Sequence, residues 1–276
     1  MDNLNYWKDK WIEVGKDYIL NKKSTKETIE VWDNTSKNYD KTVSDSRISI
    51  IRKLVEEGYI NKDSVVLDLG CGTGTYTVEL SKICKEIHAL DFSEGMLDVL
   101  KDKINKYKLK NINIIKSDWN ELDLKKENMY KKYDFVLSSL NPGCYNSENL
   151  LKINEASKDS CCYIATDGKG KNNMLKSADD FILGEKIVPS DISNIIYPFN
   201  ILYFSDYNPS LFYVTCDWIS ETNYEGAIKK LRGRYKEHLN EDIEEKIKEF
   251  VKDNINDGVF VDESKNTLGV ILWKTR

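Results

Sequence analysis

The stretch VVLDLGCGTGTYTVEL, residues 65–80, has the spacing whose chemistry is clearest in this sequence. A run typical of a buried strand breaks into three evenly spaced glycines, Gly70, Gly72 and Gly74, before an amphipathic helical pattern begins. Glycine lets the backbone approach a bound molecule closely, and a helix that starts there presents N–H groups. Nicotinamide cofactors, flavins and S-adenosylmethionine all bind at turns of this kind, so the turn alone does not choose among them.

Two features of the turn argue against a pyrophosphate ligand. In the dinucleotide-binding pattern the third glycine comes three residues after the second, whereas here it comes two residues after it. Asp68 stands two residues before the first glycine, and its carboxylate would repel a pyrophosphate but not an ammonium or a sulfonium group. The turn therefore favours a positively charged nucleoside.

Acidic residues also follow the next two predicted strands. Asp91 stands twenty-one residues after the first glycine, where a carboxylate can accept hydrogen bonds from both ribose hydroxyls. Asp118, in IIKSDWN, could accept from an adenine amino group, and Trp119 could flank the ring. Phe92 and Met96 could reach an adenine face or could belong to the core. Three such strand ends in succession are far more specific than any one of them.

The elements that must position these residues alternate along the chain. Strand-like segments are 64–69, 86–91, 113–117, 133–139 and 161–166, and helical segments are 45–57, 74–83, 93–107 and 147–157. This alternation predicts an α/β fold with a doubly wound, mostly parallel sheet. Later segments predict a short helix at 191–196, a strand at 211–218, helices at 224–239 and 240–254, and a final strand at 268–274. The last strands suggest an antiparallel hairpin at the sheet edge, with helical lid elements inserted.

The motifs VLDLGCGTGTYT, LDFSEGML, SDW and YDFVLSSLNPG resemble those of the class I S-adenosylmethionine-dependent methyltransferases, over about Trp32 to Thr166. The resemblance implies a seven-stranded Rossmann-like sheet and S-adenosylmethionine as the cofactor. From the order of the elements we expect three parts: a helical lid segment (1–45), a cofactor-binding core (46–166), and lid helices with the last strands (167–276). The cofactor-binding residues that the resemblance implies are Tyr39, Asp68, Gly70, Cys71, Gly72, Thr73, Gly74, Asp91, Phe92, Met96, Asp118, Trp119 and Ser138.

The resemblance also assigns parts of the cofactor to these residues. Asp68 and the glycine turn would hold the methionyl part, and Asp91 would take the ribose hydroxyls. Asp118 and Trp119 would hold the adenine, and Ser138 would lie near the sulfonium. For the tyrosine in VWDNTSKNYD, simple packing is an equal alternative to cofactor contact.

The loop SSLNPGCYNSE follows the fourth predicted strand and faces the expected place of the methyl acceptor. It partly resembles the N-P-P-Y motif of amino-group methyltransferases, although Gly143 replaces the second proline and Cys144 precedes Tyr145. Asn141, Cys144 and Tyr145 are therefore the candidates for substrate contact, and a simple turn is the alternative.

The two histidines do not supply an evident general base. His88 lies inside a predicted strand, which favours a core position, and His238 lies in a charged helix, which favours a solvated one. The catalytic residue, and whether the acceptor atom is nitrogen, sulfur or oxygen, therefore stay unknown.

Composition narrows the classes of partner. The chain has 276 residues, of which 32% are charged, and a formal net charge of −5, which disfavours a nucleic-acid partner. No apolar run is long enough to span a bilayer, and the charged N-terminus is unlike a signal peptide, so we expect a cytoplasmic protein without a membrane partner. With no C-x-x-C pair, no metal site is expected. The sequence therefore predicts a methyltransferase that acts on a small molecule, and it does not predict the oligomeric state. The alternatives are an RNA or protein methyltransferase and a non-catalytic cofactor-binding protein.

Overall fold

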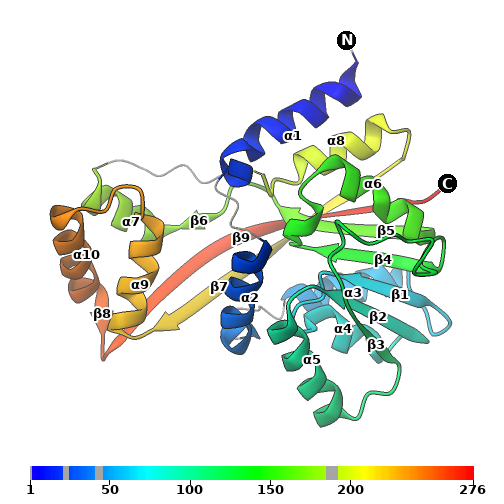
Figure 1. The fold of residues 1–276 in the computed structure, drawn as a ribbon, viewed down its shortest axis with the longest axis horizontal. Coiled ribbons are helices and arrows are strands. Elements are labelled where there is room, and N and C mark those ends of the chain that lie inside the picture. The colour runs from blue at the N-terminus through cyan, green and yellow to red at the C-terminus, as the bar shows by residue number, and fades with distance from the viewer. Residues whose placement is uncertain (1, 21–24, 41–45, 185–191) are drawn as a thin grey trace. The chain divides into compact units, whose positions relative to one another are not determined.

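The computed structural model describes residues 2–20, 25–40, 46–184 and 192–276 (Figure 1). By its internal contacts the chain divides into two units. The first comprises Met1–Lys169, Ser190–Cys216 and Thr267–Arg276. The second comprises Gly170–Pro189 and Asp217–Asn266.

The sheet of the first unit is built on five parallel strands, β1 (Val65–Leu69), β2 (Glu86–Asp91), β3 (Ile112–Lys116), β4 (Tyr133–Ser139) and β5 (Ser157–Thr166). They lie side by side in the order β3-β2-β1-β4-β5 (Figure 1). β9 (Val259–Lys274) runs antiparallel to β5, and β7 (Ser210–Thr222) pairs with β9. The predicted doubly wound, mostly parallel sheet is therefore confirmed. The order reverses between β1 and β4, which is where ligands bind in such sheets.

Helices pack on the sheet through alternating strand residues. α4 (Thr75–Ser81), α5 (Glu94–Tyr107) and α6 (Ser147–Ala156) follow β1, β2 and β4, much as the sequence predicted. Leu67 and Leu69 lie in one buried cluster with residues of α6, whereas Ala89 lies in another with Leu97 and Leu100 of α5. Because side chains alternate along a strand, the two clusters occupy opposite faces of the sheet.

Helices from both ends of the chain complete the first unit. They are α1 (Asn3–Leu20), α2 (Thr25–Tyr39), α3 (Ser46–Glu56) and α8 (Ile196–Phe204). α1 lies beside α8 (Figure 1), where the ring of Trp11 stacks on that of Tyr197 at 6.3 Å and its Nε1 donates to the carbonyl oxygen of Ile192 at 2.7 Å. Trp11 therefore packs against the body of this unit.

The short helix predicted at 191–196 is wrong. Residues 192–195 form turns and a bridge, position 191 lies outside the described residues, and α8 starts at Ile196. Pro198 follows the predicted segment and lies in the first turn of α8, where a missing N–H breaks no helical hydrogen bond.

The second unit has a helical core of its own. α7 (Asn173–Ile182), which the sequence did not predict, packs with α9 (Tyr224–Arg234) and α10 (Glu241–Asn254). The two-residue strands β6 (Lys171–Asn172) and β8 (Ile255–Asn256) pair antiparallel with β9. Arg234 donates to both oxygens of Asp179, at 2.7 and 2.6 Å, and the Tyr235 hydroxyl donates to the same carboxylate at 3.0 Å. Among the described residues, no helix has the length and apolar character that crossing a membrane requires.

Candidate functional site

A cavity of about 300 Å³ lies within the first unit, at the carboxyl ends of β1 to β4. Seven of the predicted site residues line it, each at the end of one of these strands or in the loop that follows. They are Gly70, Asp91, Phe92, Asp118, Trp119, Asn141 and Tyr145. Strands β1 to β4 run parallel and are neighbours in the sheet, so their carboxyl ends meet at one edge, and residues up to 75 positions apart share one cavity.

The glycine turn after β1 needs its glycines for two reasons. Gly70, Gly72 and Gly74 have φ angles of 72°, 53° and 85°, in the left-handed region that side chains disfavour. A Cβ atom on Gly70 would also lie 2.6 Å from Cγ of Asn141, and one on Gly74 would lie 2.4 Å from Cδ1 of Leu100. The turn is therefore wedged between the loop after β4 and helix α5.

Four backbone N–H groups of this turn, those of its three glycines and of Cys71, are already hydrogen-bonded within the protein. Gly70 and Cys71 both donate to the carbonyl oxygen of Leu90, at 2.8 and 3.0 Å. Gly72 donates to Oδ2 of Asp91 at 2.8 Å, and Gly74 donates to the carbonyl oxygen of Cys71 at 2.9 Å. A pyrophosphate-binding turn keeps such groups for its ligand. This turn therefore suits a ligand without phosphates, in agreement with the sequence argument.

Asp91 holds the glycine turn and also lines the cavity. Its Oδ2 accepts from Gly72 N and its Oδ1 from Ser93 N, at 2.8 and 2.9 Å, and the residue is 7% exposed. Burial raises its pKa, against the lowering effect of these hydrogen bonds. A carboxylate fixed in this way is preorganised to accept from hydroxyl groups that approach through the cavity.

Asp68 lies under the turn and does not line the cavity. It is 2% exposed, and Oγ1 of Thr77 in α4 donates to its Oδ2 at 2.5 Å. Burial raises its pKa to about 7. The charge of Asp68 therefore depends on pH in the neutral range.

Aromatic rings line the cavity together with Asp118. Trp119 is 3% exposed, its Nε1 donates to the carbonyl oxygen of Asn149 at 3.2 Å, and Lys152 lies 4.7 Å over its ring. Trp32 of α2 lines the same cavity, with Phe92 after β2. Such walls suit a flat, apolar heterocycle, with Asp118 available at its edge.

The loop after β4 is closed by the side chain of Asn141. Its Oδ1 accepts from Gly143 N at 2.9 Å, and its Nδ2 donates to the carbonyl oxygen of Leu69 at 3.3 Å. The same amide reaches Ser138 Oγ and Cys144 Sγ, both at 3.5 Å. Asn141 therefore ties the ends of β1 and β4 together while it lines the cavity.

The other predicted residues lie around the cavity without lining it. The ring of Tyr39 lies 6.3 Å from that of Trp32 in edge contact, and Oγ1 of Thr73 donates to Asp40 at 2.6 Å. Ser138 and Cys144 are fully buried beside Asn141, and burial raises the pKa of the Cys144 thiol to about 12. Cys71 and Met96 are buried in the packing of the turn and of α5.

Sequence reasoning missed other residues that line the cavity. They are Thr28, Trp32, Leu69, Leu90, Ser117, Asn120, Pro142, Gly143, Asn146 and Ile192. Most adjoin a predicted residue in the same loop. Trp32 lies in α2, within the predicted helical segment 1–45 and in the stretch VWDNTSKNYD. Nothing local marks Ile192, because it reaches the cavity only through the tertiary fold.

Neither histidine lines this cavity. His88 is 8% exposed, with Glu86 at 2.7 Å from its Nε2 and the Tyr133 hydroxyl at 3.1 Å from its Nδ1. His238 is exposed after α9. The predicted burial of His88 and exposure of His238 agree with the structure, but the helix predicted over 224–239 ends at Arg234, so His238 lies in a turn.

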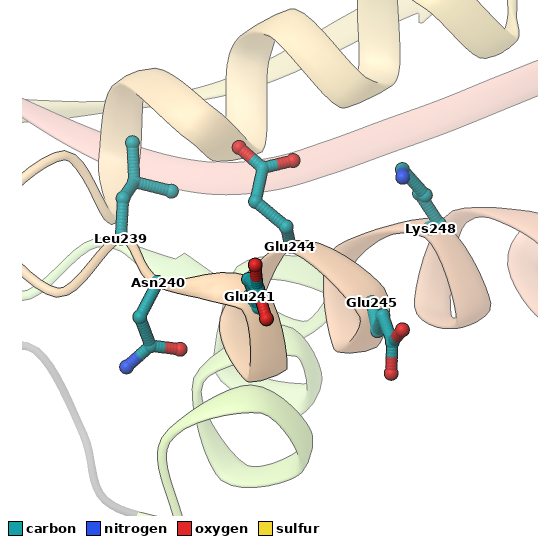
Figure 2. A pocket seen from close by; sticks show the side chains of 6 residues that line it. All are labelled: Leu239, Asn240, Glu241, Glu244, Glu245 and Lys248. Atoms are coloured by element: carbon teal, nitrogen blue, oxygen red, sulfur yellow. The ribbon is translucent and has the colours of Figure 1, made fainter.

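A second hollow, of about 400 Å³, lies at the start of α10 in the second unit. Figure 2 shows the residues that line it, namely Leu239, Asn240, Glu241, Glu244, Glu245 and Lys248. Nε and Nη2 of Arg232 already donate hydrogen bonds to the carboxylate of Glu244. The hollow lacks the aromatic walls of the cavity in the first unit, so we take the latter as the candidate site.

Residues 66–158 match the family described as "Methyltransferase domain". This range spans β1 to the start of β5 and includes every strand end that borders the cavity. It is a class I S-adenosylmethionine-dependent methyltransferase domain. The family uses S-adenosylmethionine as its methyl donor.

Curated relatives of this domain act on different substrates. One, of Methanocaldococcus jannaschii, is described as "Probable cobalt-precorrin-6B C(15)-methyltransferase (decarboxylating)" and is 35% identical over 99 residues, 36% of this chain and 50% of that protein. The ribosomal RNA small subunit methyltransferase A of Mycoplasma capricolum is 33% identical over 110 residues, 39% of this chain and 40% of that protein. The chain thus spans half the length of these relatives or less.

A solved structure agrees with the fold. A candidate methyltransferase from Bacillus halodurans C-125 aligns with a TM-score of 0.50 at 11% identity. The alignment covers 82% of this chain and 98% of that one. It supports the class I methyltransferase fold well beyond the 66–158 segment and carries no information on the substrate.

Proposed function

We propose that this chain transfers a methyl group from S-adenosylmethionine to a small molecule. The observation that carries the proposal is the cavity of about 300 Å³, in which two carboxylates, Asp91 and Asp118, meet the rings of Trp32, Phe92 and Trp119. A nucleoside with a positive charge and no phosphate matches this combination.

The residues present fit the cofactor. The turn at Gly70 brings bare backbone to the cavity wall, where a Cβ would collide with the loop after β4. Asp91 would accept from the ribose hydroxyls, and Asp118 would accept from the adenine amino group beside Trp119. Asp68 would favour the positive charge of the methionyl part from beneath the turn.

The chemistry asked of the chain is mainly positioning. The cofactor supplies an activated methyl group, which leaves by in-line displacement. The protein holds the acceptor in line and excludes water. The loop of Asn141 and Tyr145 is our candidate for acceptor contact. Because no histidine lines the cavity, we favour a nucleophile that needs little base catalysis, such as a thiol or an unprotonated amine, over a hydroxyl.

Calorimetry with S-adenosylmethionine and S-adenosylhomocysteine tests cofactor binding. We expect Asp91→Asn to weaken binding by about tenfold or more, because it removes a charge and an acceptor. Asp98→Asn is the control, since Asp98 is exposed on α5 and pairs only with Lys101 in the same helix. A wild-type chain that binds neither compound at millimolar concentration would overturn the proposal.

A ribosomal RNA substrate is the second candidate, because relatives with that activity match at 33% identity. The net charge of −5 speaks against it, since RNA binding needs clustered positive charge. Filter binding of bulk RNA across a salt series separates the two. Affinity that falls steeply with salt would favour RNA, and no binding would favour the small molecule.

Methyl transfer to any compound in a metabolite extract would separate an enzyme from a non-catalytic cofactor-binding protein. Radiolabelled S-adenosylmethionine provides the readout. We further propose that residues 1–45 include a lid, because Thr28 and Trp32 of α2 line the cavity. The remaining division, at 46–166 and 167–276, stays a prediction.

A further inference from the structure

Asn149 in α6 joins the loop after β3 to the loop after β4. Its Nδ2 donates to Oδ1 of Asn120 at 2.6 Å and to the carbonyl oxygen of Gly143 at 2.7 Å. Its own carbonyl oxygen accepts from Nε1 of Trp119 at 3.2 Å. The residue is 8% exposed and comes from the first turns of a helix, so its place is fixed by the fold and not by the loops.

The bonds on either side of Asn149 extend to both ends of the cavity. On one side, Nδ2 of Asn120 donates to Oδ1 of Asp118 at 2.6 Å, and Asp118 is the predicted adenine acceptor. On the other side, Gly143 N donates to Oδ1 of Asn141 at 2.9 Å. Nδ2 of Asn141 then reaches the carbonyl oxygen of Leu69 in the strand that leads to the glycine turn. One continuous path of hydrogen bonds therefore joins the two loops.

A buried amide that bridges two loops couples their positions. If Asn120 shifts to admit an adenine ring beside Asp118, Asn149 must keep or lose the bond that also holds Gly143. Each Nδ2 hydrogen serves one loop, so a full set of bonds requires both loops to adopt their observed positions together.

We propose that Asn149 is a positioning residue that makes the arrangement of the acceptor loop, residues 141–146, depend on occupation of the adenine end of the cavity. The inference rests on the proposed function, because it takes the Asp118 side as the adenine end. Its consequence is order in binding: the cofactor arranges the loop that receives the acceptor.

Adenosine is the probe, because it carries the adenine and ribose without the methionyl part that would itself approach the acceptor loop. Hydrogen exchange measured by mass spectrometry reports residues 118–122 and 141–146 separately. In the wild type, saturating adenosine should slow exchange in both segments, by about tenfold in 141–146 if the coupling is of ordinary size. In Asn149→Ala it should slow exchange in 118–122 alone.

Asn154→Ala is the matched control. Asn154 lies on the same helix, is 6% exposed, and bonds Leu151 and Trp273 instead of the two loops. The Asn154→Ala variant should be less stable than the wild type, but adenosine should still slow hydrogen exchange in both segments. Asn149→Asp is a second variant of the same shape that puts a carboxylate against two oxygens, and it should behave like Asn149→Ala.

The outcomes separate this inference from the proposed function. If the wild type binds S-adenosylhomocysteine but adenosine leaves 141–146 unprotected, or protects that segment equally in Asn149→Ala, the coupling is overturned and the proposed function stands. If the wild type binds neither compound, the proposed function falls, and the coupling falls with it.

Discussion

At the scale of single residues, two buried carboxylates give the glycine turn its character. Asp91 uses both oxygens to fix the turn and the start of α5, so its position is set before any ligand arrives. Asp68 accepts a hydrogen bond from Thr77 and does not line the cavity. Burial of carboxylates lowers the stability of a folded domain, and such buried acids are common at functional sites.

The stability of the chain should depend on the ionisation of Asp68. Burial raises its pKa from 3.8 to about 7, so between these values the folded chain holds a proton that the unfolded chain has released. The contribution of this group is full below about pH 4 and is lost as the pH rises through 7. The free energy of unfolding of Asp68→Asn, measured relative to that of the wild type, should therefore rise by on the order of 3 kcal/mol as the pH goes from 5 to 8.

Urea unfolding at several pH values measures this difference. Asp63→Asn is the control, because Asp63 is exposed in the turn before β1. Its difference from the wild type should stay flat with pH. A flat difference for Asp68→Asn as well would show that the carboxyl group titrates normally.

The sequence predicted the strand-end acids because parallel strands bring their ends to one edge whatever lies between them. It could not predict which neighbours would be buried. Met96 and Cys144 follow strand ends just as Phe92 and Tyr145 do, but helix and turn geometry points them into the packing. Asn149 gave no signal, because an asparagine near a helix start is normally a cap and its partner Asn120 lies 29 residues away in the sequence.

At the scale of elements, α2 is attached to the core by Asp33. Its Oδ1 accepts from Ser93 Oγ at 2.6 Å and from Gly95 N at 2.9 Å, which caps the start of α5 from another helix. A Cβ on Gly95 would lie 2.8 Å from Cα of Asp33, so the two backbones meet closely. Thr28 and Trp32 of the same helix line the cavity. The attachment of α2 thus sets one wall of the site.

Asp33→Ala should loosen this wall. We expect a loss of about 1–2 kcal/mol, typical of a removed cap, and a several-fold weaker affinity for S-adenosylhomocysteine. Thermal unfolding and calorimetry provide the two measurements. Glu30→Ala is the control, because Glu30 is exposed on α2. If Asp33→Ala lost stability with no change in affinity, the wall would be independent of its attachment.

The alternation of elements from β1 to β5 was predicted because each switch between period 2 and period 3.6 carries its own turn signal. The elements after Thr166 were harder. α7 lies within a mixed stretch whose helical face is recognisable only once its partners in α9 and α10 are known. β9 extends back to Val259 through the polar run DESKN, which has no strand-like pattern of its own.

At the scale of the whole molecule, the second unit contains a buried ion pair between Arg234 and Asp179. Asp179 is 3% exposed and receives both Arg234 and the Tyr235 hydroxyl. Arg234→Ala should lower the free energy of unfolding by about 3–5 kcal/mol, because it removes a guanidinium that makes two hydrogen bonds to a buried carboxylate. Hydrogen exchange in α7, α9 and α10 should rise accordingly.

Arg232→Ala is the matched control for this prediction. Arg232 lies two residues away on α9, and its side chain is 46% exposed while it pairs with Glu244. An exposed pair contributes about 0–1 kcal/mol, so this variant should exchange nearly as the wild type does. Equal effects of the two substitutions would mean that burial adds nothing to the Asp179 pair.

The hydrogen bonds inside the glycine turn also have a consequence for selectivity. A cell holds large pools of ATP and NAD, which share adenosine with the cofactor. Because Leu90 and Asp91 already occupy N–H groups of the turn, a polyphosphate chain would find few donors there and a carboxylate close by. The main-chain hydrogen bonds of the turn therefore disfavour these abundant competitors. Exchanging side chains in the turn should not convert the turn into a dinucleotide-binding site.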